Sequence, residues 1–75
     1  MKELIEAIVK PLVDHPEDVR VTETTNGGKV IYQLSVHKDD MGKVIGKQGR
    51  IAKSIRTVVY AAAAHRNEHV YLDIV

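Results

Sequence analysis

The chain has 75 residues, no cysteine and a formal net charge of +1 at pH 7. A chain of this length forms one small domain that buries only about 60–65% of its unfolded surface, which excludes a deep enzyme cleft combined with a cofactor-binding fold. The lack of cysteine also excludes a disulfide framework, a thiolate nucleophile and a cysteine-based zinc site.

The first part of the chain is predicted to form a helix followed by a β-hairpin. Apolar residues recur at helical spacing from Leu4 to Val13. Pro11 has no backbone N–H, so it should kink or restart this helix before the helix ends near His15. The segments Val19–Thr22 and Val30–His37 alternate between apolar and polar residues on either side of an Asn-Gly-Gly turn signal, which predicts two antiparallel strands.

The rest of the chain is predicted to add two helices and a third strand. Asp39 is expected to cap a short helix that ends near Ile45, and a longer helix is expected from about Arg50 to Asn67. Alternation over Val70–Ile74 predicts the last strand. The longer helix is expected to place Ile51, Ile55, Val58, Val59 and Ala62 in the core and to point Arg50, Lys53 and Thr57 the other way.

The order of the predicted elements indicates an α+β fold. It reads helix, strand, strand, helix, loop, helix, strand, with no linker or repeat in residues 1–75. A three-stranded sheet with the helices packed on one face is the simplest arrangement that buries every apolar stripe. We therefore expect a single domain of this architecture.

The segment between the last two helices has the composition of an anion-binding loop. Gly46 and Gly49 enclose Lys47 and Gln48. Glycines let the backbone turn sharply and bring its N–H groups close to another molecule. The helix that follows would direct its positive N-terminal end to the same place.

Charge is segregated along the chain around this loop. Residues 41–67 contain six basic side chains and no acidic one, whereas the other five basic and all ten acidic residues lie outside this stretch. Such asymmetry favours a polyanionic partner over a merely solvated helix face. We expect the partner to be a phosphodiester backbone.

Catalytic and metal-binding interpretations are weaker. The run from Gly42 to Lys47 is one residue shorter than a nucleotide-binding P-loop, and Gln48 stands where a magnesium-binding Ser or Thr would be. His65 and His69 are spaced like metal ligands, but the helix end near Asn67 should separate them. His15, His37 and the Asp39-Asp40 pair are interpreted as structural or capping residues. We expect no enzyme activity, no metal and no cofactor.

The chain also gives no indication of contact with a membrane. Acidic residues occur within the first six positions, where a signal peptide would have an unbroken apolar stretch. The longest uncharged run after them, Thr57–Ala64, is far shorter than the ~20 residues of a spanning helix. We expect a cytoplasmic protein.

The segment from Gly42 to Ile55 resembles the signature of a KH domain, in which a G-x-x-G loop joins two helices and holds about four nucleotides of a single strand. The order of elements resembles the bacterial, type II form. With Leu12–Pro16 ahead of the hairpin, the chain resembles the single-domain KhpA family over essentially all 75 residues.

The resemblance implies binding of single-stranded RNA, with the Gly46–Gly49 loop on the phosphate backbone and the bases facing a groove that Val70–Leu72 would border. No Trp or Phe is present to line the groove and stack on bases, so weak binding of low sequence specificity is expected. The implied RNA-binding residues are Gly42, Lys43, Ile45, Gly46, Lys47, Gln48, Gly49, Arg50 and Lys53.

The resemblance further implies an RNA chaperone or post-transcriptional regulator linked to cell growth and division, and association with itself or with a larger KH protein of the KhpB (Jag) type. Tyr60, Ala61 and Ala64 are placed on or beside the solvent side of the longer helix, where the small alanine side chains would either let another helix approach or serve simply as good helix formers. The alternative interpretation is a protein-interaction module in which RNA contact is incidental. Single-stranded DNA also stays open as the ligand, because the 2′-hydroxyl distinguishes the two and no residue indicates which.

Overall fold

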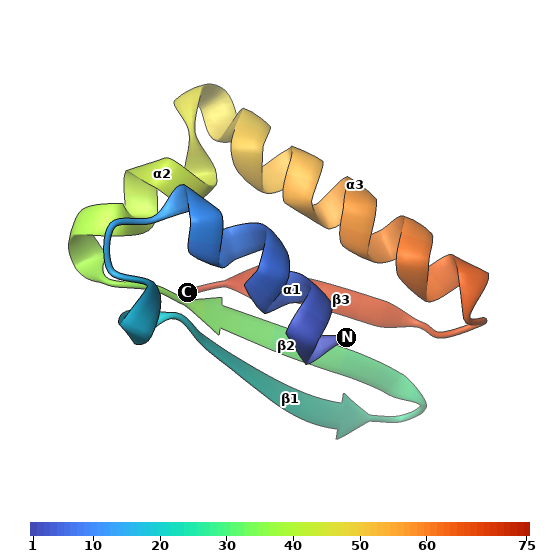
Figure 1. Cartoon of the computed structure of the whole chain (residues 1–75). Coiled ribbons are helices and arrows are strands. Elements are labelled where there is room, and N and C mark those ends of the chain that lie inside the picture. The colour runs from blue at the N-terminus through green and yellow to red at the C-terminus, as the bar shows by residue number, and fades with distance from the viewer.

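Three helices cover one face of a three-stranded mixed sheet in the computed structural model, which describes all 75 residues (Figure 1). This confirms the predicted α+β architecture and element order. The elements are α1 (Lys2–Val9), β1 (Arg20–Asn26), β2 (Lys29–Ser35), α2 (Met41–Ile45), α3 (Arg50–His65) and β3 (Val70–Ile74). Short 3₁₀ turns occupy residues 10–12, 16–18, 38–40 and 47–49.

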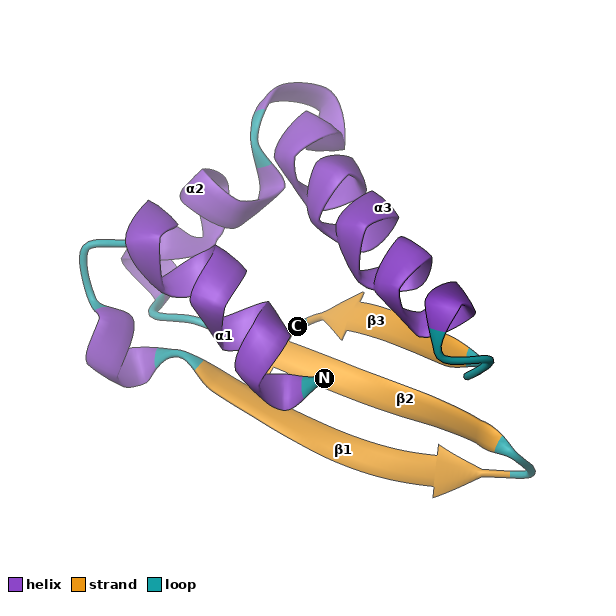
Figure 2. Cartoon of the chain, turned by 45° about the vertical axis from the view of Figure 1, so that its right-hand side comes forward, coloured by secondary structure: helices purple, strands orange, loops and turns teal.

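The sheet has the order β1-β2-β3. β1 and β2 pair in antiparallel fashion, with Asn26 opposite Lys29 at the turn, as the hairpin signal predicted. β2 and β3 pair in parallel, with Tyr32 opposite Leu72. Parallel neighbours need a crossover connection, and α2, the glycine loop and α3 form it (Figure 2).

The core lies between the sheet and the helices. Alternate strand residues point into it because side chains along a strand have a period of two. α1 contributes two side chains four residues apart, Ile5 and Val9. The buried apolar cluster comprises Ile5, Val9, Val19, Val21, Tyr32, Leu34, Val44, Ile55, Val59 and Leu72.

The predicted core face of α3 is partly wrong. Ile51 and Val58 are 37% and 49% exposed, and Ala62 is half-buried. The buried residues of α3 are Ala52, Ile55, Val59 and Ala63. The actual stripe begins and ends with alanine, and the sequence interpretation favoured the larger apolar residues next to it.

α3 also ends at His65, two residues earlier than predicted. Asn67 adopts a left-handed conformation with φ = 58°. The N–H groups of Asn67 and Glu68 donate to the carbonyls of Ala64 and Ala63 at 3.1 and 2.9 Å. This is the Schellman pattern, which satisfies the last carbonyls of a helix.

Pro11 interrupts the N-terminal helix as predicted, but the helical segment ends at Leu12 and not near His15. α1 ends at Val9 and continues as a 3₁₀ turn over residues 10–12. The change of helix type leaves Leu12, which the apolar stripe placed in the core, 41% exposed.

None of the helices combines the length and the apolar character that crossing a bilayer requires.

Neighbouring substitutions test the orientation of α3. Val59→Asp should unfold the domain at 25 °C, because an unpaired carboxylate in the core costs several kcal/mol, about as much as the whole stability of a small domain. Val58→Asp should change the free energy of unfolding by less than about 1 kcal/mol. Circular dichroism and urea unfolding measure both. Equal effects of the two substitutions would contradict the orientation described here.

Candidate nucleic-acid interface

The loop between α2 and α3 has a backbone that requires glycine at its first position. Gly46 has φ = 73°, and a Cβ atom there would lie 2.6 Å from Cγ1 of Ile51. Gln48 and Gly49 are also in the positive-φ region, at 57° and 72°. Any side chain at position 46 would therefore be both strained and in collision, because L residues disfavour this conformation.

The exposed side chains on and after the loop are basic or polar. Lys47, Gln48, Arg50 and Lys53 are all exposed, and Arg50 Nη2 donates to Gln48 Oε1 at 3.4 Å. None of the five ion pairs in the structure involves Lys47, Arg50 or Lys53. These three charges are therefore free to face an anion.

α2 presents a smooth surface beside the loop. Gly42 is exposed, and a Cβ atom built there meets no protein atom within 4 Å. Ile45 is half-buried and packs against the core cluster, which anchors the loop. The structure thus brings all nine predicted site residues together on α2, the loop and the first turn of α3, namely Gly42, Lys43, Ile45, Gly46, Lys47, Gln48, Gly49, Arg50 and Lys53.

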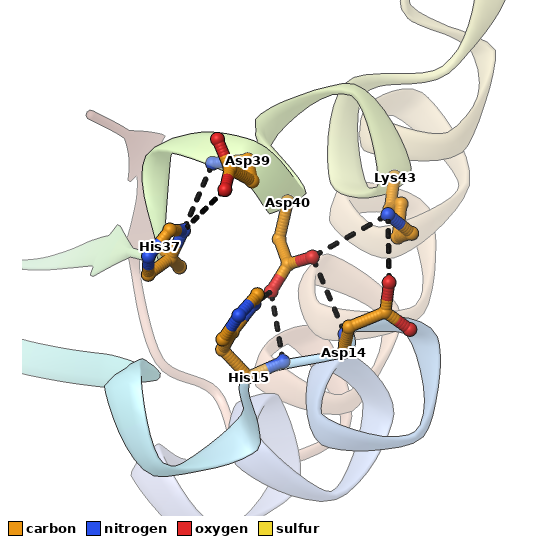
Figure 3. Close-up of polar contacts among 6 residues, drawn as sticks. All are labelled: Asp14, His15, His37, Asp39, Asp40 and Lys43. Atoms are coloured by element: carbon orange, nitrogen blue, oxygen red, sulfur yellow. Dashed lines mark hydrogen bonds and ion pairs between the residues drawn. The ribbon is translucent and has the colours of Figure 1, made fainter.

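Lys43 differs from the other basic residues of the set because acidic side chains hold it. Its Nζ lies 3.2 Å from Asp14 Oδ2 and 3.5 Å from Asp40 Oδ1 (Figure 3). The hydrogen bond with Asp14 is the main reason why the pKa of Lys43 is raised. Its charge is therefore shared within the chain.

Asp40 is the one polar residue that the fold buries completely. Its Oδ1 accepts from the Asp14 N–H at 3.3 Å, and its Oδ2 accepts from the His15 N–H at 2.9 Å and from His15 Nδ1 at 3.0 Å. Burial alone would raise the pKa of Asp40, but the hydrogen bonds from the His15 ring and from the two backbone N–H groups lower it to about 2. The hydrogen bond to Asp40 in turn raises the pKa of His15.

The predicted capping role of Asp39 is wrong. The Asp39 N–H donates to His37 Nδ1 at 3.0 Å, so His37 caps the turn before α2. Asp40 occupies the N-cap position of α2 but makes no side-chain cap bond, because its carboxylate faces His15. The His15 and His37 rings stack with centroids 4.0 Å apart, which confirms a structural role for both histidines.

Two side chains of α3, Arg56 and Tyr60, form hydrogen bonds with the edge strand β3. Arg56 Nε donates to the Leu72 carbonyl at 3.1 Å, and the Leu72 N–H donates to the Tyr60 hydroxyl at 3.2 Å. The Tyr60 hydroxyl thus reaches β3, whereas the sequence interpretation placed this residue on or beside the solvent side. The sequence interpretation expected Val70–Leu72 to border the groove that the bases face. In the structure the N–H and carbonyl groups of Leu72 are already hydrogen-bonded within the chain.

A cleft of about 360 Å³ lies between the start of α3 and the end of α1. The sequence interpretation missed it, because it assigned three exposed residues of this cleft, Leu12, Ile51 and Val58, to the core. The cleft is mostly apolar and is lined by Ile8, Leu12, Arg50, Ile51, Ser54, Ile55 and Val58.

Metal-ligand geometry is absent from the structure. No group of three or more His, Asp or Glu side chains is placed to hold a metal ion. His65 ends α3, and His69 precedes β3 with its carbonyl accepting from the Val30 N–H at 2.9 Å. Both histidines are exposed.

The arrangement of two helices, a G-x-x-G loop and flanking strands matches a known family. The family model described as KhpA/KhpB, KH domain, matches residues 2–74. The chain belongs to the KhpA/KhpB KH-domain family. This is a family without enzyme activity, so the prediction that the chain is not an enzyme is confirmed.

Curated relatives of this KhpA/KhpB chain are named RNA-binding protein KhpA. The relative from Oceanobacillus iheyensis is 60% identical over 74 residues, which cover 99% of both chains. The relative from Listeria monocytogenes is 57% identical over 100% of this chain and 99% of the relative. The relative from Bacillus subtilis is 53% identical over 74 residues, which cover 99% of this chain and 91% of the relative.

A solved structure also shares the fold of this KhpA/KhpB chain. It is the crystal structure of Era in complex with MgGDPNP and nucleotides 1506–1542 of 16S ribosomal RNA. The TM-score is 0.66 at 18% identity, over 97% of this chain and 28% of the Era chain. At this identity the likeness concerns the fold alone.

The buried carboxylate predicts a component of acid sensitivity. Because the pKa of Asp40 is about 2 in the folded state against an ordinary 3.8, the unfolded chain binds more protons between these values and stability falls as pH drops through them. Asp40→Asn should lower the melting temperature near pH 7 by several degrees and flatten its decline between about pH 4 and 2. Differential scanning calorimetry measures both effects.

The matched control is Asp39→Asn, which removes an exposed carboxylate one residue away. It should keep the wild-type slope of melting temperature against pH. An unchanged slope in Asp40→Asn would contradict the contribution assigned to the buried carboxylate.

Proposed function

We propose that this chain binds single-stranded RNA with the Gly46–Gly49 loop against the phosphate backbone. The observation that carries the proposal is the combination of a glycine-dependent loop with three unpaired cations, Lys47, Arg50 and Lys53, beside it. RNA rather than single-stranded DNA is proposed because the curated relatives are named RNA-binding proteins.

Each part of the site has a physical role in this proposal. The positive-φ loop lets backbone N–H groups approach phosphate oxygens, and the unpaired cations neutralise them. Gly42 has no side chain and so leaves room for the RNA strand to pass over α2, and Ile45 forms part of the groove wall. Lys43 contributes less, because Asp14 and Asp40 already engage its charge.

The proposed binding is weak and tolerant of sequence. No aromatic residue lies on α2, the loop or the first turn of α3, and the outward backbone groups of Leu72 are engaged by Arg56 and Tyr60. Affinity would therefore come mainly from phosphate contacts, which do not read sequence. Such binding suits an RNA chaperone or post-transcriptional regulator that acts on many transcripts in the cytoplasm and affects cell growth and division.

A second candidate function is favoured by the apolar cleft between α1 and α3. Leu12, Ile51 and Val58 are large apolar residues exposed on this side. Such exposed residues around a cleft are typical of protein interaction sites. The chain would then associate through this cleft with a second copy or with a larger KH protein of the KhpB (Jag) type.

A double substitution tests the RNA-binding loop. Lys47→Asp with Gln48→Asp should abolish binding of a short fluorescent single-stranded RNA, because two negative charges then face the phosphates, and should leave the circular dichroism spectrum unchanged. The wild-type affinity should fall about 20- to 60-fold between 50 and 200 mM salt, a slope of about −2 to −3.

The matched control is Lys10→Asp with Lys29→Asp, two exposed lysines outside the acid-free stretch. This variant removes two lysines, whereas the loop variant removes one, and it makes the net charge at least as negative as the loop variant does. It should nevertheless keep most of the wild-type affinity. Binding by the loop variant at the wild-type level, or unfolding of that variant, would show that the loop is assigned wrongly.

The interaction module has a separate test. Val58→Asp places a charge in the exposed part of the cleft and should shift any dimer to monomer in sedimentation-velocity runs, since a dry interface disfavours an unpaired carboxylate. Gln33→Asp, at an exposed position on β2 outside the cleft, is the control. If wild type is monomeric at 100 μM, or if both variants dissociate alike, the cleft is not the self-association surface.

A further inference from the structure

Asp40 contacts Asp14, His15 and Lys43, and these four residues are called the Asp40 cluster. Asp40 precedes α2, and the proposed RNA-binding loop follows it. α2 has only five residues, Met41–Ile45, so Asp40 and Gly46 are separated by about 9 Å along the helix axis. The cluster joins α2 to a distant segment, because the Asp40 carboxylate accepts from the backbone of both Asp14 and His15. Charge at the cluster is therefore close enough to act on phosphates at the loop.

The cluster contains more acidic than basic groups when His15 is neutral. Lys43 is its only permanent cation and contacts two carboxylates, Asp14 and Asp40. A proton on His15 adds a second cation, held against Asp40 Oδ2 at 3.0 Å. The groups that face His15 from its surroundings are Asp14, Glu17, Asp18, His37, Asp40 and Lys43.

We propose that His15 is a positioning residue for RNA binding, whose protonation against Asp40 strengthens the hold of the Gly46–Gly49 loop on the phosphate backbone. The inference rests on the proposed RNA-binding function and adds its dependence on pH. His15 touches no RNA; it acts through Asp40, which fixes the start of α2, and through the charge of the cluster.

The sign follows from the electrostatics. Protonated His15 makes the surroundings of α2 less negative, so a phosphate strand is repelled less at low pH than at high pH. The pKa of His15 is raised above its ordinary value of 6.5, mainly by its hydrogen bond to Asp40. One added charge at about 10 Å, partly screened, corresponds to about a 2- to 5-fold change in affinity at low salt.

Binding linkage makes the effect reciprocal. If protonation of His15 tightens RNA binding by a given factor, RNA must raise the pKa of His15 by the logarithm of that factor. The shift expected on saturation with RNA is therefore about 0.3 to 0.7 pH units. A residue that only stabilised the fold would show no such shift, so this measurement separates positioning from plain stabilisation.

The experiment measures affinity for a short fluorescent single-stranded RNA from pH 6 to 8.5 at 50 mM salt. Wild-type affinity should fall about 2- to 5-fold over this range. His15→Gln, which keeps a hydrogen-bond donor but carries no charge, should bind with an affinity that does not vary with pH. The control with His65→Gln and His69→Gln, two exposed histidines remote from Asp40 in the fold, should keep the wild-type dependence.

NMR titration of the His15 ring in the wild-type protein, with and without RNA, completes the test without any variant and covers the case in which His15→Gln does not fold. Binding that is independent of pH, a pH dependence retained in folded His15→Gln, or an unshifted His15 titration would each overturn the inference while leaving the RNA-binding function intact. Absence of RNA binding at every pH would overturn the proposed function and, with it, this inference.

Discussion

The parallel pairing of β2 with β3 determines where everything else in this fold lies. Two parallel neighbours in a sheet cannot be joined by a tight turn, so the chain has to travel back across the sheet between them. α2 and α3 form this crossover connection, and their residues Val44, Ile55 and Val59 are buried in the core with residues of the strands. The change of direction between the two helices falls at Gly46–Gly49. The loop is therefore a necessary corner of the topology, and glycine at position 46 is what lets the corner pass close to Ile51.

Around this corner the fold sorts charge into two groups. Acidic side chains gather before α2, where Asp40 and Asp14 engage Lys43 and His15. Basic side chains follow α2 and have no acidic partner. The short helix between the two groups separates charge that is used for internal structure from charge that faces solvent. The segregation of charge along the sequence thus corresponds to two groups of side chains in the structure, one on each side of α2.

What the sequence predicts well is local. The alternation in the strands, the Asn-Gly-Gly turn and the spacing of the glycines are properties of neighbouring residues, and they gave the architecture and the position of the loop. The Asp40–His15 bond joins residues 25 positions apart, so no local pattern indicates which of the two adjacent aspartates is buried. The rotation of α3 was missed for a different reason. Hydrophobicity ranks Ile51 and Val58 above Ala52 and Ala63, whereas the direction in which α3 faces the rest of the fold buries the two alanines and leaves the larger residues exposed.

The hydrogen bonds from α3 to Leu72 affect how the domain meets other polypeptides. An open edge strand is a template on which a foreign strand can pair, and proteins commonly obstruct such edges to avoid aggregation. Here Arg56 and Tyr60 occupy both outward backbone groups at the middle of β3. A strand from another chain would have to displace two internal bonds to extend the sheet on that side, so sheet extension is directed to the β1 edge, on the other side of β2 from β3. Sheet extension at that edge leaves the helical crossover, and with it the loop, uncovered.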